Sequence, residues 1–244
     1  MTVPCISKHC REALNLKHDL LSQYAAEIIV APWLYENSTI YIISPWISNF
    51  RCMLRGKIIP DLTSPNPCLI EFLKFIRSNN GETRILVRPL HSLISIEKIR
   101  FIQRMIEKNI SDLPISTLIH DILAYRDMIQ TLLEIFQKSL ANVRFMERLH
   151  AKILATPYRA IIGSSNYTLS GLYGNVEVNV MLLGNDAKKI YDIAQRLWKS
   201  GKTLSDVRIM TNRLVRSLAL VADKDPRLLK LKEILERLIN LSSQ

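Results

Sequence analysis

The chain has 244 residues, enough for one large domain or for one domain with an appendage. Its hydrophobic content of 48% fits a globular protein with a sizeable core, and no apolar run approaches the ~20 residues that span a bilayer, so we expect no stable membrane insertion. The net charge of +11 favours a polyanionic partner, either nucleic acid or an anionic membrane surface, although a solvated charged surface is the simpler alternative.

Residues 6–30 predict a helix, because their apolar side chains recur near helical spacing. The first twenty residues carry charged side chains where a signal peptide has an apolar centre, so we expect a cytoplasmic protein. Cys5, His9 and Cys10 lie close together, but their spacing is poor for zinc. We expect buried or free thiols, with a zinc site as the less favoured alternative, and no metal or other cofactor.

Strand and helix signals then alternate. Residues 39–43 are a short β-branched run closed by Ser44-Pro45, which is typical of a buried strand. The loop 64–67 begins a short amphipathic helix that Asn79-Asn80-Gly81 ends. A second buried strand is predicted over 84–88.

Two helices, 95–109 and 116–139, are expected next, separated at Asp112-Leu113-Pro114. Strand-like segments follow at 142–147, 149–155 and 160–162. In the last predicted strand the valines at 176, 178 and 180 form an apolar face, and the residues at 177, 179 and 181 form the opposite, polar face. A helix begins after the turn at 184–186 and ends near Gly201.

Alternating strands and helices predict an α/β domain, a mixed sheet flanked by helices. We place this domain at residues 1–202, with a helical insertion at about 95–139, and a C-terminal helical extension at 203–244. In the extension, Asp225-Pro226 begins a helix with a leucine stripe. The usual interpretation is a helix packed on the domain, while a dimer contact and a DNA-facing appendage are alternatives.

His150 and Lys152 are the first candidates for chemistry. In a strand, residues two apart point to the same face, so these side chains project together while Leu149, Ala151 and Ile153 face the core. A neutral imidazole can attack phosphorus and form a phosphohistidine. A lysine beside it is a compact positive charge for phosphate oxygens.

A small polar cluster follows. Gly163 lets the backbone approach an anion closely, while Ser164 and Asn166 supply a hydroxyl and an amide for phosphate oxygens. Glu177 lies on the polar face of its predicted strand and is the natural partner of His150, since a carboxylate bonded to the far ring nitrogen fixes the tautomer. Five of the six charged residues between positions 138 and 174 are basic, which favours an anionic substrate.

At these residues the chain resembles the phospholipase D superfamily, whose signature is H-x-K, an Asp after four residues, and G-S-x-N. Here it reads His150-x-Lys152, then Gly163-Ser164-x-Asn166, with Glu177 eleven residues later. Residues 42–47 and 85–89 look like the family's opening strands, and the resemblance covers about residues 20–200. Pro157 departs from the pattern, because it occupies the position of the Asp, and the connector to Gly163 is one residue short. A tighter hairpin is one explanation.

The resemblance implies a mechanism without metal. Family sites use two motif copies, with one histidine as nucleophile and the other as general acid. This chain holds one copy, since its remaining histidines have no lysine two residues on. The implied arrangement is a homodimer in which His150 of both subunits face each other.

The sequence is compatible with three classes of function. The first is a metal-independent nuclease for DNA or RNA. The second is a phospholipid-directed phosphodiesterase, against which we note that no amphipathic helix is rich in aromatic residues. The third is a non-catalytic nucleic-acid-binding protein that retains the fold, which Pro157 leaves open.

Overall fold

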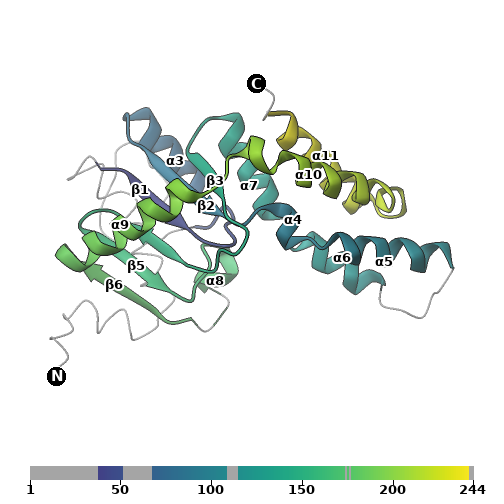
Figure 1. Ribbon diagram of the computed structural model, residues 1–244, viewed down its shortest axis with the longest axis horizontal. Coiled ribbons are helices and arrows are strands. Elements are labelled where there is room, and N and C mark those ends of the chain that lie inside the picture. Colours follow the sequence, from purple (N-terminus) through teal and green to yellow (C-terminus); the bar gives the residue numbers. More distant parts are fainter. Residues whose placement is uncertain (1–37, 52–67, 109–114, 174, 176, 242–244) are drawn as a thin grey trace.

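A mixed six-stranded sheet with helices on both faces forms the centre of the molecule, as predicted (Figure 1). The computed structural model describes residues 38–51, 68–108, 115–173, 175 and 177–241. The predicted helix 6–30, the Cys5, His9 and Cys10 cluster and the loop 64–67 lie outside the described residues.

The strand order is β3-β2-β1-β4-β5-β6. The parallel half consists of β1 (Ile40–Ile43), β2 (Thr83–Val87) and β3 (Asn142–Phe145). The antiparallel half consists of β4 (Ile153–Ala155), β5 (Arg159–Gly163) and β6 (Asn179–Leu183). The first three strands therefore end at the same edge of the sheet at which β4 and β6 begin and β5 ends. We call it the carboxyl edge.

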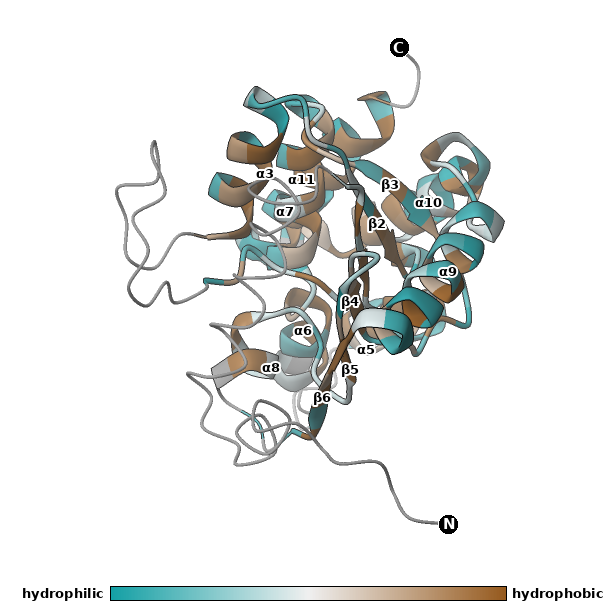
Figure 2. Cartoon of the chain, turned by 90° about the vertical axis from the view of Figure 1, so that its left-hand side faces the viewer, coloured by the Kyte–Doolittle hydropathy of each residue, from teal (hydrophilic) through white to brown (hydrophobic). Residues whose placement is uncertain are grey.

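Each face of the sheet has its own helical layer. One face carries α3 (Leu69–Ser78) and α7 (Arg126–Gln137), and the other carries α9 (Gly184–Ser200) (Figure 2). Successive strand residues alternate between the layers, as the period of two requires. Ile42 belongs to the core on the α3 and α7 side, whereas Ile43 packs with the buried alanines of α9.

Further helices project from one end of the sheet (Figure 1). They are α4 (Leu90–Leu93), α5 (Ile96–Glu107), α6 (Ile115–Leu123) and α10 (Leu204–Ala219). None of the helices in the described ranges is both long and apolar enough to cross a membrane.

The prediction of one long helix over 116–139 is wrong, because α6 and α7 are separate helices with a turn at Ala124 and Tyr125. Both helices contact α11 (Pro226–Leu241), but α6 also packs against α5 whereas α7 also packs against α3. The Tyr125 ring lies 5.0 Å from the ring of Trp46, which fastens the turn to the segment after β1. A periodicity of 3.6 does not reveal such a change of direction.

The C-terminal segment packs on the rest of the chain. After α10 and the short helix η2 (Ala222–Lys224), α11 (Pro226–Leu241) begins at the predicted proline. Its leucine stripe is buried in the same core as β1 and α7. The leucine stripe therefore packs against other parts of the same chain. The domain boundary at residue 202 stays a prediction. The remaining helix, α8 (Leu169–Tyr173), follows β5.

Candidate active site

His150 and Lys152 lie at the carboxyl edge, directly before β4. The predicted strand over 149–155 is shorter in the structure, but the alternation holds, since Leu149 and Ile153 are buried in the α9-side core. The Lys152 Nζ lies 3.3 Å from the His150 Nε2. An ammonium group can only donate, so this contact fits an imidazole with its lone pair on Nε2. The structure therefore brings the two predicted residues together.

The Lys152 ammonium is buried, with 8% of the residue exposed, whereas His150 is exposed. Burial lowers the pKa of Lys152 below its ordinary value of 10.5, and the nearby negative charge of Glu177 partly opposes this shift. Burying a cation carries a desolvation cost, and groups with perturbed pKa values concentrate at functional sites.

Residues 163–166 form the turn that follows β5, and β6 holds it in place. The Ser164 amide donates to the Val178 carbonyl at 2.9 Å, and the Val178 amide donates to Ser164 Oγ at 2.9 Å. A Cβ at Gly163 would lie 2.3 Å from the Val178 oxygen, so only glycine fits there. The Gly163 amide also donates to the Lys152 carbonyl at 3.4 Å, which joins the turn to the lysine.

Asn166 is held from β1 by a residue that the sequence did not single out. Ser44 follows β1 directly and is fully buried. Its hydroxyl donates to the Trp46 carbonyl at 2.6 Å and lies 3.4 Å from Asn166 Oδ1. The Tyr167 amide donates back to Ser44 Oγ at 3.3 Å. A polar residue at the end of a parallel strand was the signal that could have revealed it.

Glu177 lies just before β6, and its carboxylate faces Ser164. It accepts hydrogen bonds from Ser164 Oγ and from Asn175 Nδ2, the latter at 3.3 Å. In the described part of the chain, its hydrogen bonds go to these two residues and not to His150, the partner that the sequence suggests. The negative charge of Glu177 raises the pKa of Lys152, and Lys152 contacts the imidazole of His150.

The predicted faces of the last strand are reversed. β6 begins only at Asn179, and Asn179 and Met181 are buried while Val178 is 56% exposed. Asn179 can be buried because its amide is paired with Ser165, donating to Ser165 Oγ at 2.7 Å. Hydropathy alone assigns such an asparagine to the solvent side.

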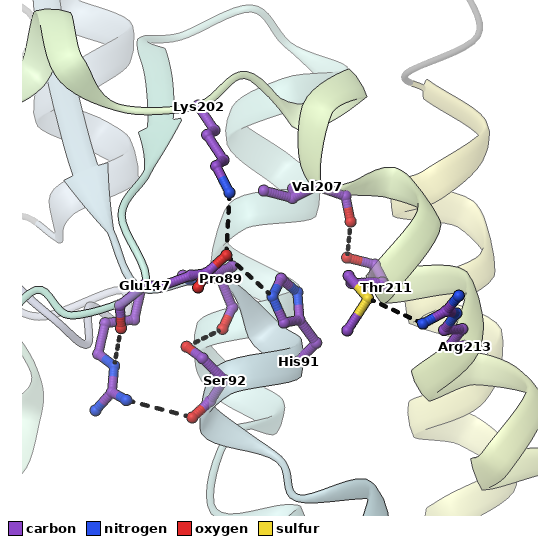
Figure 3. A network of polar contacts seen from close by, with 10 residues as sticks. Pro89, His91, Ser92, Glu147, Lys202, Val207, Thr211 and Arg213 are labelled. Carbon is purple, nitrogen blue, oxygen red and sulfur yellow. Dashed lines mark hydrogen bonds and ion pairs between the residues drawn. The ribbon is translucent and has the colours of Figure 1, made fainter.

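An ion cluster anchors the turn between β3 and His150 (Figure 3). Glu147 lies 3.0 Å from Lys202 Nζ and 4.0 Å from His91 Nε2, and its backbone oxygen accepts from Arg88 Nε at 3.2 Å. The Lys202 ammonium lowers the pKa of Glu147, and burial lowers the pKa of His91 below 6.5. The segment that leads to His150 is therefore tied to β2, α4 and the end of α9.

Pro157 lies at the opposite edge of the sheet from His150, in the tight hairpin that joins β4 to β5. The hairpin is closed by the Thr156 amide, which donates to the Arg159 carbonyl at 2.8 Å. Thr156 Oγ1 accepts from the Arg159 amide at 3.2 Å. Pro157 is thus separated from His150 and Lys152 by the length of β4.

All six predicted site residues, together with Ser44, gather at the carboxyl edge. The arrangement combines an exposed imidazole, a buried ammonium, a hydroxyl, an amide and a carboxylate. These groups can attack phosphorus and hold phosphate oxygens. In the described ranges, no group of three or more His, Cys, Asp or Glu side chains could hold a metal ion.

Comparison with known proteins finds similarity among solved structures. No family model matches the chain, and no curated protein matches it. Among solved structures, the chain is similar to a phospholipase D family member, Nuc from Salmonella typhimurium. The identity is 12%, the match covers 72% of this chain and 88% of that chain, and the TM-score is 0.42.

Proposed function

We propose that this chain is a metal-independent phosphodiesterase, an endonuclease on DNA or RNA, that works through a phosphohistidine at His150. The observation that supports this most is the 3.3 Å contact between His150 Nε2 and the buried Lys152 ammonium, beside the 163–166 turn. A nucleophile and a fixed positive charge have to meet at one phosphate for this chemistry. The net charge of +11 fits a nucleic-acid substrate.

In the proposed reaction, His150 Nε2 attacks phosphorus and the bond from phosphorus to the leaving oxygen breaks. The leaving oxygen takes a proton from a second histidine, which His150 of another copy of the chain supplies. Water then attacks the phosphohistidine, returns its proton to that second histidine and frees His150. Lys152, Ser164 and Asn166 hold the non-bridging oxygens, and Glu177 orients His150 once phosphate has taken over the Ser164 hydroxyl. The exposure of His150 leaves it accessible to a second copy.

To test this, wild type and His150→Ala are each incubated in excess EDTA with plasmid, single-stranded DNA, RNA or phospholipid vesicles, and cleavage of each substrate is measured. We expect cleavage of nucleic acid by wild type and a loss of about 10³-fold or more in His150→Ala, because the nucleophile is removed. Cleavage of phospholipid without cleavage of nucleic acid would show that the substrate is a phospholipid. If both proteins are inert but bind DNA, the chain is a non-catalytic binding protein.

The shared site has its own test. Wild type that is unfolded and refolded with an excess of His150→Ala should lose more activity than dilution explains, because every mixed dimer lacks one of the two histidines of the shared site. Light scattering on the active sample should give the mass of a dimer. A monomer at micromolar concentration with full activity would contradict the shared site.

A further inference from the structure

The first residue of β6, Asn179, is a buried asparagine whose side-chain amide makes two hydrogen bonds with Ser165. Its Nδ2 donates to Ser165 Oγ at 2.7 Å, and its Oδ1 accepts from the Ser165 amide at 3.4 Å. Asn179 is 7% exposed and Ser165 is 1% exposed. Two buried polar groups of Ser165 are thus satisfied by one side chain, from a strand 14 residues further along the chain.

Ser165 is the inward-facing centre of the 163–166 turn. Ser164 on one side of it is exposed and Asn166 on the other is half-buried, so these two side chains remain on the carboxyl edge while Ser165 points into the protein. The direction in which Ser165 is held therefore sets where the Ser164 hydroxyl and the Asn166 amide point. Asn179 makes two contacts with Ser165, and two contacts fix an orientation that one would leave free to rotate.

The contact leaves no room for adjustment. Gly163 pairs with Asn179 at the end of the β5 and β6 ladder, and a Cβ on Gly163 would lie 2.3 Å from Asn179 Oδ1. The backbone at the start of the turn thus packs directly on the asparagine amide. A different side chain at 179 would move the turn as well as lose its hydrogen bonds.

We infer that Asn179 is a positioning residue for the phosphate site, and that it acts through Ser165 to aim Ser164 and Asn166. The inference rests on the proposed function, because the turn is the part of that site that holds phosphate oxygens. An amide suits the task, since it offers both an acceptor and a donor without charge. A carboxylate at the same place would add a negative charge beside an anionic substrate.

The experiment compares Asn179→Leu with Met181→Ala. Leucine has a similar size but cannot pair with Ser165. Met181 is buried on the same face of β6, two residues further from the turn, so its truncation weakens packing without touching Ser165. We measure kcat and KM on bis(4-nitrophenyl) phosphate, the binding of inorganic phosphate, and the melting temperature of each variant.

For Asn179→Leu we expect kcat/KM to fall about 10- to 100-fold, because small displacements of positioning groups have effects of this size. Phosphate affinity should fall with it. The pH profile should keep its wild-type shape, because Asn179 does not titrate. Met181→Ala should melt at a lower temperature and yet keep both constants within about twofold of wild type.

Ser165→Ala provides a second route if Asn179→Leu does not fold. It removes one of the two contacts, so we expect a smaller loss in the same direction. Where Asn179→Leu does fold, the losses should not add in the double variant of Asn179→Leu and Ser165→Ala, because Asn179 acts through Ser165. Additive losses would overturn the inference.

The outcomes separate this inference from the proposed function. If wild type cleaves the substrate and neither variant changes kcat/KM or phosphate affinity by more than about twofold, the inference fails and the function stands. If wild type binds phosphate without cleaving and Asn179→Leu weakens that binding, the inference stands for a non-catalytic protein. If wild type neither cleaves nor binds phosphate, both fail.

Discussion

Lys152 Nζ lies 3.3 Å from His150 Nε2, although the lysine is buried and the histidine is exposed. The two side chains thus meet at the protein surface, where the imidazole is open to solvent and the lysine is covered by the protein. Burying the lysine costs desolvation free energy, and a protein that binds an anion can offset this cost when the anion is bound.

Lys152→Met should abolish phosphodiester cleavage while leaving the protein at least as stable at neutral pH. The folded-state pKa of Lys152 lies below 10.5 because of burial, so the unfolded chain binds the proton more tightly. The free energy of unfolding of wild type therefore rises with pH from that lowered pKa to about 10.5. Urea unfolding between pH 7 and pH 10.5 should show this rise in wild type and a smaller one in Lys152→Met. Equal slopes would contradict the burial of the charge.

The ion cluster at Glu147 should give the protein an acid-sensitive stability. Burial lowers the pKa of His91 below 6.5, and Lys202 adds to this shift while Glu147 opposes it. As pH falls through 6.5, the unfolded chain takes up a proton that the folded chain does not, so the free energy of unfolding decreases. His91→Phe keeps a buried ring without the titration. Unfolding curves from pH 7.5 to pH 5 should be flatter for this variant, and a slope equal to that of wild type would exclude His91 as the cause.

Gly163→Ala should disrupt the site, because its Cβ would lie 2.3 Å from two oxygen atoms of residues 178 and 179. We expect a loss of about 1–3 kcal/mol in the free energy of unfolding, as for other overpacked positions, together with loss of cleavage. Gly184→Ala is the matched control. Nothing lies within 4 Å of its Cβ, and its φ of +58° costs alanine about 1 kcal/mol. This control should keep full activity, whereas equal activity of the two variants would argue against the fixed turn.

Glu177→Gln keeps the size of the side chain and an acceptor for Ser164 but removes the negative charge. If Glu177 turns to His150 when phosphate occupies the turn, kcat should fall by about 10²-fold, the lower range for general acid–base and orienting groups. Phosphate binding should become tighter, because the negative charge beside Ser164 no longer repels the anion. The measurement is steady-state kinetics alongside phosphate titration. Unchanged kcat with unchanged affinity would leave Glu177 without a part in the reaction.

Much of the sheet follows from the sequence, because its strands are short apolar runs with clear ends. The runs at 39–43 and 84–88 are β1 and β2 to within a residue. The break between α6 and α7 cannot be predicted from the sequence, since it depends on which neighbouring helices the two apolar stripes pack against. The shift of β6 does not follow either, because Asn179 is buried by a hydrogen bond to a residue 14 positions earlier.

The same division holds at the site. His150, Lys152, Ser164 and Asn166 could be named because their types and order carry a chemical meaning in the sequence. The buried Ser44, 122 positions before Asn166, and the pairing of Glu177 with Ser164 needed the register of the sheet. Contacts that cross the carboxyl edge depend on which strands are neighbours, and local pattern does not contain that order.

The most direct test of the central claim is to trap the covalent intermediate. Wild type is mixed with a labelled oligonucleotide in excess EDTA, quenched in alkali to preserve phosphohistidine, and digested for mass spectrometry. If His150 is the nucleophile, we expect a nucleotide adduct on His150 that is absent from His150→Ala. Cleavage of the oligonucleotide at an equal rate by His150→Ala, with no adduct on wild type, would contradict it.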